Sequence, residues 1–245
     1  MTLRRFLAIL AAAAAVFATT ATSAEPVARS VSVALGDGTV VLPVADGFAE
    51  PAATPEVLRG IITRALPATN RFMAMMLSQD FLDRRAAGEP VHLGRYFLVQ
   101  TYRGAEQAGM STDDFEQVKA MFRKQGGAIL SGSKAAAQEG IDRAAKDVGD
   151  ITGDKSVAIK TGDVKTLGVF DEQDNSISLA TVQPITATDK TGSRTTNQVM
   201  ALAIVRVQGK PVGVSVYSDY GSQVDVDWAE RQVTAWVKRL NELNP

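Results

Sequence analysis

The chain has 245 residues, no cysteine and one histidine, and its 26 basic and 27 acidic residues give a net charge of −1. The absence of cysteine excludes disulfides and thiolate chemistry, and a single histidine excludes multi-histidine metal sites and most Ser-His catalytic arrangements. The charge balance argues against nucleic acid and anionic membrane surfaces as partners, because both favour a basic surface. With 45% apolar residues, a hydrophobic core is expected to supply the stability.

The first 24 residues have the pattern of a secretory signal peptide. An Arg4-Arg5 pair precedes an apolar run that ends at about Ala18, and small residues lead to Ala24. The run is shorter than the roughly 20 residues that span a bilayer, so cleavage near Ala24 is preferred over a retained anchor. We expect residues 25–245 to form a single exported α+β domain, and a cysteine-free exported protein fits the bacterial periplasm.

The N-terminal part of the mature chain predicts a hairpin and then a helix. Two β-branched runs, 31–35 and 39–44, flank a short loop that contains two glycines. Thr54 then has the place of an N-cap, followed by Pro55 and an acidic first turn, and the helix is expected to end at Pro67. Its expected buried stripe consists of Val57, Leu58, Ile61, Ile62 and Ala65.

The segment 70–82 fits either a buried strand or a short helix, and a strand is favoured. It contains three methionines, Met73, Met75 and Met76. Core filling explains them better than copper ligation, because no histidine or cysteine accompanies them. A further strand is predicted over 94–102, where aromatic and β-branched residues dominate.

Two helices are predicted in the middle of the chain. Ser111 and Asp114 have capping-box spacing, and the helix that follows is expected to stop at Gly126-Gly127. The second helix is expected over 134–148, with Gly149 just beyond its end.

From residue 156 onward the pattern has period two and predicts strands over 164–170, 176–183, 199–207 and 212–218. The polar segment 186–196 is predicted to be a mobile loop. The segment 199–207 is apolar on both faces, typical of a central strand, and Gly209-Lys210 fits a type II′ turn. Ser222 and Asp225 then predict the capping box of a long amphipathic C-terminal helix. The expected fold class is α+β, an antiparallel β-sheet packed with helices.

The order of these elements, with Leu42-Pro43 and Gly47-Phe48 after the first hairpin, resembles the PsbP/Mog1-like α/β/α sandwich. The resemblance spans about 31–243 and rests on element order. The resemblance implies an accessory or binding protein without a catalytic site. The family has no fixed motif from which functional residues of this chain could be assigned.

One sequence pattern resembles that of an enzyme class. Ser131 and Lys134 are followed by Lys-Thr-Gly segments at 160–162 and 190–192, which are similar to motifs of penicillin-recognising acyl transferases. The order of the elements fails, since Ser218-Asp219 comes last. Serine-lysine chemistry also needs a neutral, buried Lys134 beside Ser131. A Ser-Lys envelope hydrolase is therefore the alternative, and a non-catalytic protein is the main hypothesis.

Other candidate residues have simpler explanations. His92 is expected in a solvent-facing loop, and no nucleophile elbow accompanies it. The acidic run at 171–175 (Asp171, Glu172, Asp174 and Asn175) lacks the spacing of a calcium loop and is interpreted as a solvated turn. Trp236 is expected in the core. Tyr220 and Trp228, near the start of the last helix, are either packed or exposed as binding anchors, with packing favoured.

The function expected from these features is that of a periplasmic, non-catalytic binding or accessory protein of the cell envelope. No cofactor, metal ligand or catalytic residue is assigned, and the binding residues are not specified. The expected partner is another envelope protein or component, and no transmembrane segment is expected after signal removal.

Overall fold

The computed structural model describes residues 29–89, 92–132 and 134–245. The predicted signal peptide and its cleavage near Ala24 lie outside the described residues. The elements are β1 (Ser30–Leu35), β2 (Gly38–Pro43), the 3-10 turn η1 (Pro51–Ala53), α1 (Glu56–Ala65), β3 (Asn70–Leu77), α2 (Gln79–Ala86), β4 (Tyr96–Tyr102), α3 (Arg103–Ala108), α4 (Thr112–Gly132), α5 (Lys134–Thr152), β5 (Ala158–Thr161), β6 (Lys165–Gln173), β7 (Ser176–Asp189), β8 (Gly192–Val207), β9 (Lys210–Asp219) and α6 (Gln223–Leu243).

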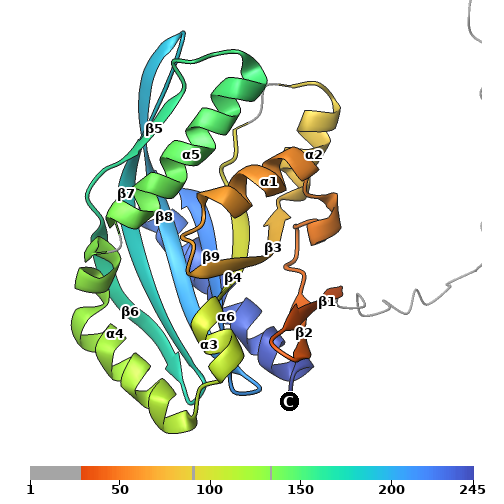
Figure 1. The fold of residues 1–245 in the computed structure, drawn as a ribbon, viewed down its shortest axis with the longest axis vertical. Coiled ribbons are helices and arrows are strands. Elements are labelled where there is room, and N and C mark those ends of the chain that lie inside the picture. The colour runs from red at the N-terminus through yellow and green to blue at the C-terminus, as the bar shows by residue number, and fades with distance from the viewer. Residues whose placement is uncertain (1–28, 90–91, 133) are drawn as a thin grey trace, which may run out of the picture.

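The main sheet has the strand order β3-β4-β9-β8-β7-β5, with β6 also paired to β7, and every pairing is antiparallel. Helix α6 lies behind this sheet, whereas α1, α4 and α5 lie in front of it (Figure 1). The α+β class with an antiparallel sheet and a long C-terminal helix is therefore confirmed. Within the described ranges, none of the helices combines the length and the apolar composition of a membrane span.

The main core lies between α6 and the centre of the sheet. Alternate residues of β8 from Val199 to Val207 are at most 3% exposed, and they face the buried side of α6. Their neighbours Leu202 and Ile204 pack on the other face against Phe122 of α4. A charge on β8 at Val205 would therefore have no access to water. The prediction that 199–207 is a central strand covered on both faces is confirmed.

The turn between β8 and β9 differs from the predicted one. Val207 pairs with Lys210, so the two turn residues are Gln208 and Gly209, with φ angles of 50° and 74°. Positive φ at both positions defines a type I′ turn, whose twist matches that of the flanking strands. The predicted hairpin is correct, but its type II′ turn at Gly209-Lys210 is wrong by one residue.

The predicted N-terminal hairpin is confirmed as β1 and β2, which form a separate two-stranded sheet. The indole Nε1 of Trp236 donates to the carbonyl of Pro43 at 2.8 Å. Asn244 accepts from the Val41 N–H and donates to its carbonyl, both at 2.8 Å. The hairpin is thus held to α6 and adds its apolar side chains to the main core.

The segment 70–82 combines both alternatives in sequence. The favoured strand is confirmed as β3 over Asn70–Leu77, and α2 follows from Gln79. The Ser78 hydroxyl accepts from the N–H of Phe81 and caps this helix. Met75 and Met76, at 0% and 1% exposure, are core residues as predicted.

Helix α1 is less buried than its apolar pattern predicts. No residue of α1 is fully buried, and Val57 is 57% exposed, although Leu58 and Ile62 pack against the cluster around Met75. Thr54 is also not the N-cap, because its hydroxyl donates to the Met75 carbonyl and the helix begins at Glu56. A short helix at the sheet's edge covers only part of the surface that its sequence could bury.

The glycines that were expected to end two helices lie inside those helices. Helix α4 begins after the predicted Ser111–Asp114 capping box but continues to Gly132, and α5 continues past Gly149 to Thr152. A Cβ on Gly127 would lie 2.8 Å from Oγ1 of Thr166, and one on Gly149 would lie 2.7 Å from the Asp154 carbonyl oxygen. The predicted stops are wrong, because both helices continue through these glycines, and the close approach of Thr166 and Asp154 favours a residue without a side chain there.

The segment 186–196 is not a loop. Strands β7 and β8 stay paired in one register out to Asp189 and Gly192, beyond the centre of the sheet. Side-chain hydroxyls pair across the strands, Thr186 with Thr195 and Thr188 with Ser193, both at 2.8 Å. We call residues 184–197 the arm; it extends from the sheet together with β5 (Figure 1). Threonine is β-branched and polar, so it forms exposed strands that resemble loops in composition.

Candidate functional site

The chain passes from β9 into α6 through a short segment whose geometry is fixed by hydrogen bonds. The Asp225 carboxylate accepts from the N–H groups of Gly221 and Ser222, at 2.9 and 3.1 Å. The predicted capping box is therefore present. It sets the direction of the first turn of α6, so that Val224 is 68% exposed, and Tyr220 just before it is 36% exposed.

Trp228 follows one turn later and is half-buried. The Arg95 guanidinium lies 4.2 Å from the centre of its ring, in cation–π geometry. Phe48 lies on the core side, with ring centroids 6.5 Å apart. Trp228 is therefore packed, as favoured, against Phe48 and Arg95. Trp236 is confirmed as a core residue, at 2% exposure.

His92 lies in the loop before β4 and is exposed, as predicted. Its Nε2 is 2.9 Å from the carboxylate of Asp219, the last residue of β9. We call His92, Arg95, Tyr220, Val224 and Trp228 the junction surface. The His92–Asp219 contact and the 3.7 Å ion pair of Arg95 with Asp225 connect the loop before β4 to the start of α6. The other members of the surface are close in sequence to Asp219 and Asp225.

Two tyrosines lie beside this surface on the sheet. The rings of Tyr96 and Tyr217 stack with centroids 4.5 Å apart and planes 13° apart. Burial raises the pKa of Tyr96 well above its usual range, and it also raises the pKa of Tyr217. Both phenols therefore stay protonated near neutral pH and act as packing groups.

The Ser-Lys pattern falls at the junction of α4 and α5. Lys134 is 38% exposed, and its Nζ lies 2.8 Å from the Asp163 carboxylate. This hydrogen bond lowers the pKa of Asp163. The side chain of Ser131 lies outside the part of the chain that the structure describes. Lys134 lacks the burial that its neutral form would need.

The acidic turn between β6 and β7 contacts groups of the same chain. Glu172 lies 3.3 Å from Arg123 and 3.8 Å from the buried Lys119, whose Nζ also donates to the Gln173 carbonyl at 3.0 Å. The Asn175 amide donates to Asn241 at 2.8 Å. Over residues 29–89, 92–132 and 134–245, no group of three or more metal-binding side chains occurs.

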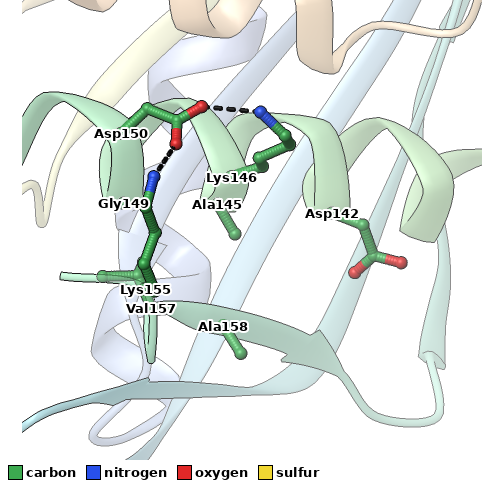
Figure 2. Close-up of a pocket in the computed structure, with 8 residues that line it drawn as sticks. All are labelled: Asp142, Ala145, Lys146, Gly149, Asp150, Lys155, Val157 and Ala158. Carbon is green, nitrogen blue, oxygen red and sulfur yellow. Dashed lines mark hydrogen bonds and ion pairs between the residues drawn. The ribbon is translucent and has the colours of Figure 1, made fainter. Parts of the chain in front are cut away.

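A depression of about 450 Å³ lies between α5 and β5 (Figure 2). Asp150 at its rim bonds to Lys146 at 2.6 Å and to Lys155, and these bonds lower the pKa of Asp150 to about 2. The carboxylate thus neutralises part of the charge of the two lysines. This open depression has no convergent unpaired groups to orient a ligand.

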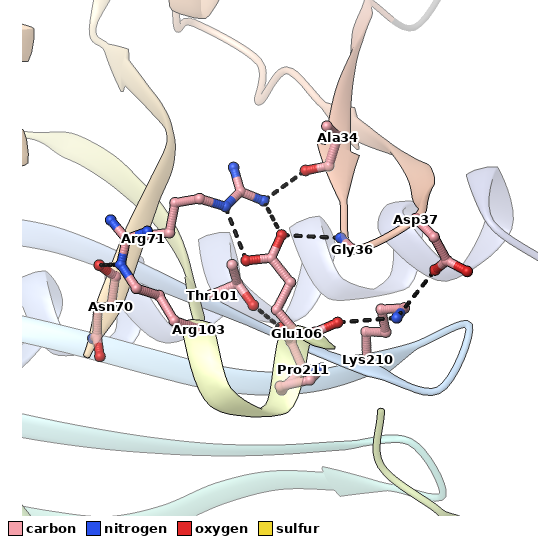
Figure 3. A network of polar contacts seen from close by, with 10 residues as sticks. All are labelled: Ala34, Gly36, Asp37, Asn70, Arg71, Thr101, Arg103, Glu106, Lys210 and Pro211. Atoms are coloured by element: carbon pink, nitrogen blue, oxygen red, sulfur yellow. Dashed lines mark hydrogen bonds and ion pairs between the residues drawn. The ribbon is translucent and has the colours of Figure 1, made fainter. Parts of the chain in front are cut away.

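A polar network joins four segments that are distant in sequence (Figure 3). The buried carboxylate of Glu106 accepts two hydrogen bonds from Arg71, at 2.5 and 2.9 Å, and one from the Gly36 N–H at 2.9 Å. Lys210 donates to the Glu106 carbonyl at 2.9 Å and lies 3.2 Å from Asp37. Arg71 chiefly lowers the pKa of Glu106, with help from the Gly36 N–H. The network holds the β1–β2 turn against the sheet, so its role is structural.

Sequence reasoning named Tyr220 and Trp228 but missed Arg95, His92 and Val224 as members of one surface. Val224 could have been found, because it is an apolar residue that lies off the buried stripe of α6. No sequence pattern around Arg95 predicts its contact with Trp228, because the two residues lie in segments that are far apart in sequence.

No protein-family model matches the chain, and no curated protein matches its sequence. Among solved structures, the chain is similar to the Ran-binding protein Mog1p of Saccharomyces cerevisiae, with 14% identity over 89% of this chain and 93% of that one, and a TM-score of 0.29. A similarity at this TM-score carries no argument about the fold or the partner of this chain.

Proposed function

We propose that the protein is an exported, non-catalytic binding or accessory protein of the cell envelope, and that the junction surface contacts its partner. The observation that carries the proposal is the exposure of Val224 and Tyr220 beside Trp228 and Arg95. Tryptophan, tyrosine and arginine are enriched among the residues that dominate binding energy at protein interfaces. An exposed apolar group beside them would lose water on binding.

The proposed localisation of the protein in the cell envelope rests on the signal-peptide pattern of residues 1–24. The order of elements supports membership of the PsbP/Mog1-like group of binding and accessory proteins as part of the same proposal. The partner is proposed to be another envelope protein or component.

Two matched variants test the role of the junction surface. Val224 is the second residue of α6 and Val57 is the second residue of α1, and both are more than half exposed. A glutamate at either place suits the positive end of a helix, so neither Val224→Glu nor Val57→Glu is expected to unfold the protein.

The two variants and the unchanged protein are immobilised and incubated with envelope extract, and bound proteins are quantified by mass spectrometry. We expect the unchanged chain and Val57→Glu to retain the same envelope protein in similar amounts. Val224→Glu should retain at least about tenfold less of it, because a charge would be buried at the contact. Equal retention by all three would contradict the junction surface as the binding site.

The Ser-Lys hydrolase remains the alternative, although no observation favours it. We expect the purified protein to form no covalent adduct with β-lactam or fluorophosphonate probes, because Lys134 is only partly buried and is paired with Asp163. A stoichiometric adduct at Ser131, abolished by Lys134→Ala in intact-mass measurement, would overturn the non-catalytic proposal.

A further inference from the structure

Along Gly192–Thr196, no strand of the described ranges lies next to β8 on its β9 side. Strand β9 pairs with β8 only as far as Gln198 and Asp219, and the Tyr220 N–H adds one bond to the Asn197 carbonyl at 2.8 Å. Beyond this bond, β8 continues through Thr195 and Ser193 to Gly192. There it pairs with β7 alone among the described residues.

The Asn197 bond fixes the direction of the backbone groups of the arm. In an antiparallel ladder, successive residues point their N–H and C=O groups to opposite sides. Asn197 points toward β9, so Thr195 and Ser193 point the same way, to the side where β9 has ended. Arg194 and Thr196 point toward their β7 partners Ala187 and Ile185. The edge therefore presents the N–H and C=O groups of two alternate residues to solvent.

The edges at β5, β6 and β3 have features that hinder pairing with foreign strands. At β5, the Gln138 side chain donates to the Ile159 carbonyl and accepts from the Thr161 N–H. Strand β6 has irregular register between Thr166 and Gly168 and again between Val169 and Asp171. At β3, the Ala49 N–H and the Thr54 hydroxyl bond to carbonyls of the strand. The β8 edge at 192–197 has no register shift and no proline, and Arg194 is its single charged residue. Natural sheets use such devices to prevent edge pairing, so a regular edge without them is suited to a partner strand.

We propose that an extended acidic segment of the partner adds to the sheet as a strand along Ser193–Asn197, next to the junction surface at Tyr220. This inference deepens the proposed function and rests on it. The main-chain groups of Ser193 and Thr195 provide the ladder bonds. Tyr220 limits the added strand at one end, because it occupies the next position of the β9 ladder.

Charge selects a partner segment over a second copy of the chain. Arg194 is the one charged residue of the open edge, whereas Lys190 at the tip of the arm lies near two acids, Asp189 and Asp154. Two arms paired edge to edge would bring two copies of Arg194 to neighbouring positions, which is unfavourable. An acidic segment would place a carboxylate beside Arg194.

The test uses two capped eight-residue peptides, one of alternating threonine and glutamate and one of alternating threonine and lysine. Each is titrated into the isotopically labelled protein, and backbone amide shifts are followed by NMR. We expect the acidic peptide to shift the amides of Ser193 and Thr195 more than those of Arg194 and Thr196, and to bind at least about tenfold more tightly than the basic one.

Two variants separate the backbone and charge contributions. Thr195→Pro removes one edge N–H that faces solvent, and it is expected to weaken the acidic peptide about tenfold. Its folding is checked by thermal unfolding. Arg194→Glu leaves the backbone intact and should reverse the preference between the two peptides.

The absence of shifts in the arm, or equal binding of both peptides, would overturn the strand-addition proposal. Concentration-dependent dimerisation in sedimentation, abolished by Thr195→Pro, would also overturn it in favour of a second copy. The strand-addition proposal and the proposed function can fail independently. The retention assay with Val224→Glu tests the proposed function whether or not the peptides bind the arm.

Discussion

Strand β8 passes through two regions of opposite character. From Val199 to Val205 it is central, paired on both sides and covered on both faces. From Gly192 to Thr196 it is polar and mostly exposed, and among the residues that the structure describes it pairs only with β7. The same register continues through both regions, so the backbone is regular even where no core covers it.

The comparison shows that the two regions derive their order from different sources. The central region is stabilised by burial of valine and alanine side chains between the sheet and α6. The arm is ordered by its ladder to β7 and by hydroxyl pairs such as Thr186 with Thr195. A regular strand without burial has an edge available for binding, which the central region lacks.

The largest effect is expected where a charge enters the central region. Val205 is 0% exposed, so Val205→Asp would bury an unpaired carboxylate. We expect a loss of more than about 4 kcal/mol in the free energy of unfolding, or no folded protein. Urea unfolding followed by circular dichroism measures it. A loss of less than about 1 kcal/mol would show that this region is not the core.

A smaller effect is expected at the network that holds the N-terminal hairpin to the sheet. Glu106→Gln keeps the shape of the side chain but removes its charge from the Arg71 contact, and we expect a loss of about 2 kcal/mol. Because the folded state lowers the pKa of Glu106, its charge stabilises the protein above the unfolded pKa, and this contribution is lost as pH falls through the folded pKa.

Chemical unfolding of both proteins at pH 7 and pH 3 tests this assignment. We expect the difference in the free energy of unfolding between the unchanged protein and Glu106→Gln to shrink at the lower pH. A difference that stays constant would mean that the charge of Glu106 does not stabilise the hairpin contact.

Two proline variants sharpen the comparison within the arm. The Thr196 N–H points to β7, so Thr196→Pro removes a ladder bond and is expected to cost about 2 to 3 kcal/mol. The Thr195 N–H points to the open edge, so Thr195→Pro removes no ladder bond and loses only the exposed hydroxyl pair with Thr186, which should cost less than about 1 kcal/mol. Thermal unfolding compares the two variants, and equal losses would contradict the assigned directions.

The smallest effect is expected at the tip of the arm. Lys190 is exposed. Lys190→Ala should therefore change the free energy of unfolding by less than about 0.5 kcal/mol in the same assay. A larger change would show that the tip contributes to folding stability.

Much of the fold follows from sequence patterns. Alternation predicted the central strands, the capping box predicted α6, and glycines with β-branched runs predicted the first hairpin. The errors have physical causes: Gly127 and Gly149 allow close helix packing and do not end helices, and the threonines of the arm form a strand that is not buried. Pattern reasoning assigns exposed polar segments to loops, because it detects burial and not pairing.

The candidate site could be predicted only in part. Aromatic residues near the α6 start indicated Tyr220 and Trp228. The contacts of Trp228 with Arg95, and of Asp219 with His92, depend on which strand lies beside β9, and no local pattern contains this information. The open edge of β8 likewise depends on where β9 ends in space.

Amide hydrogen exchange along β8, followed residue by residue by NMR, tests the central claim most directly. In the arm, we expect the amides of Ser193 and Thr195 to exchange rapidly and those of Arg194 and Thr196 to be protected, whereas all amides from Val199 to Val205 are protected. Fast exchange of all four arm amides would mean a mobile loop, and protection of all four would mean that the edge is already paired. Either result would contradict an ordered strand with an open edge.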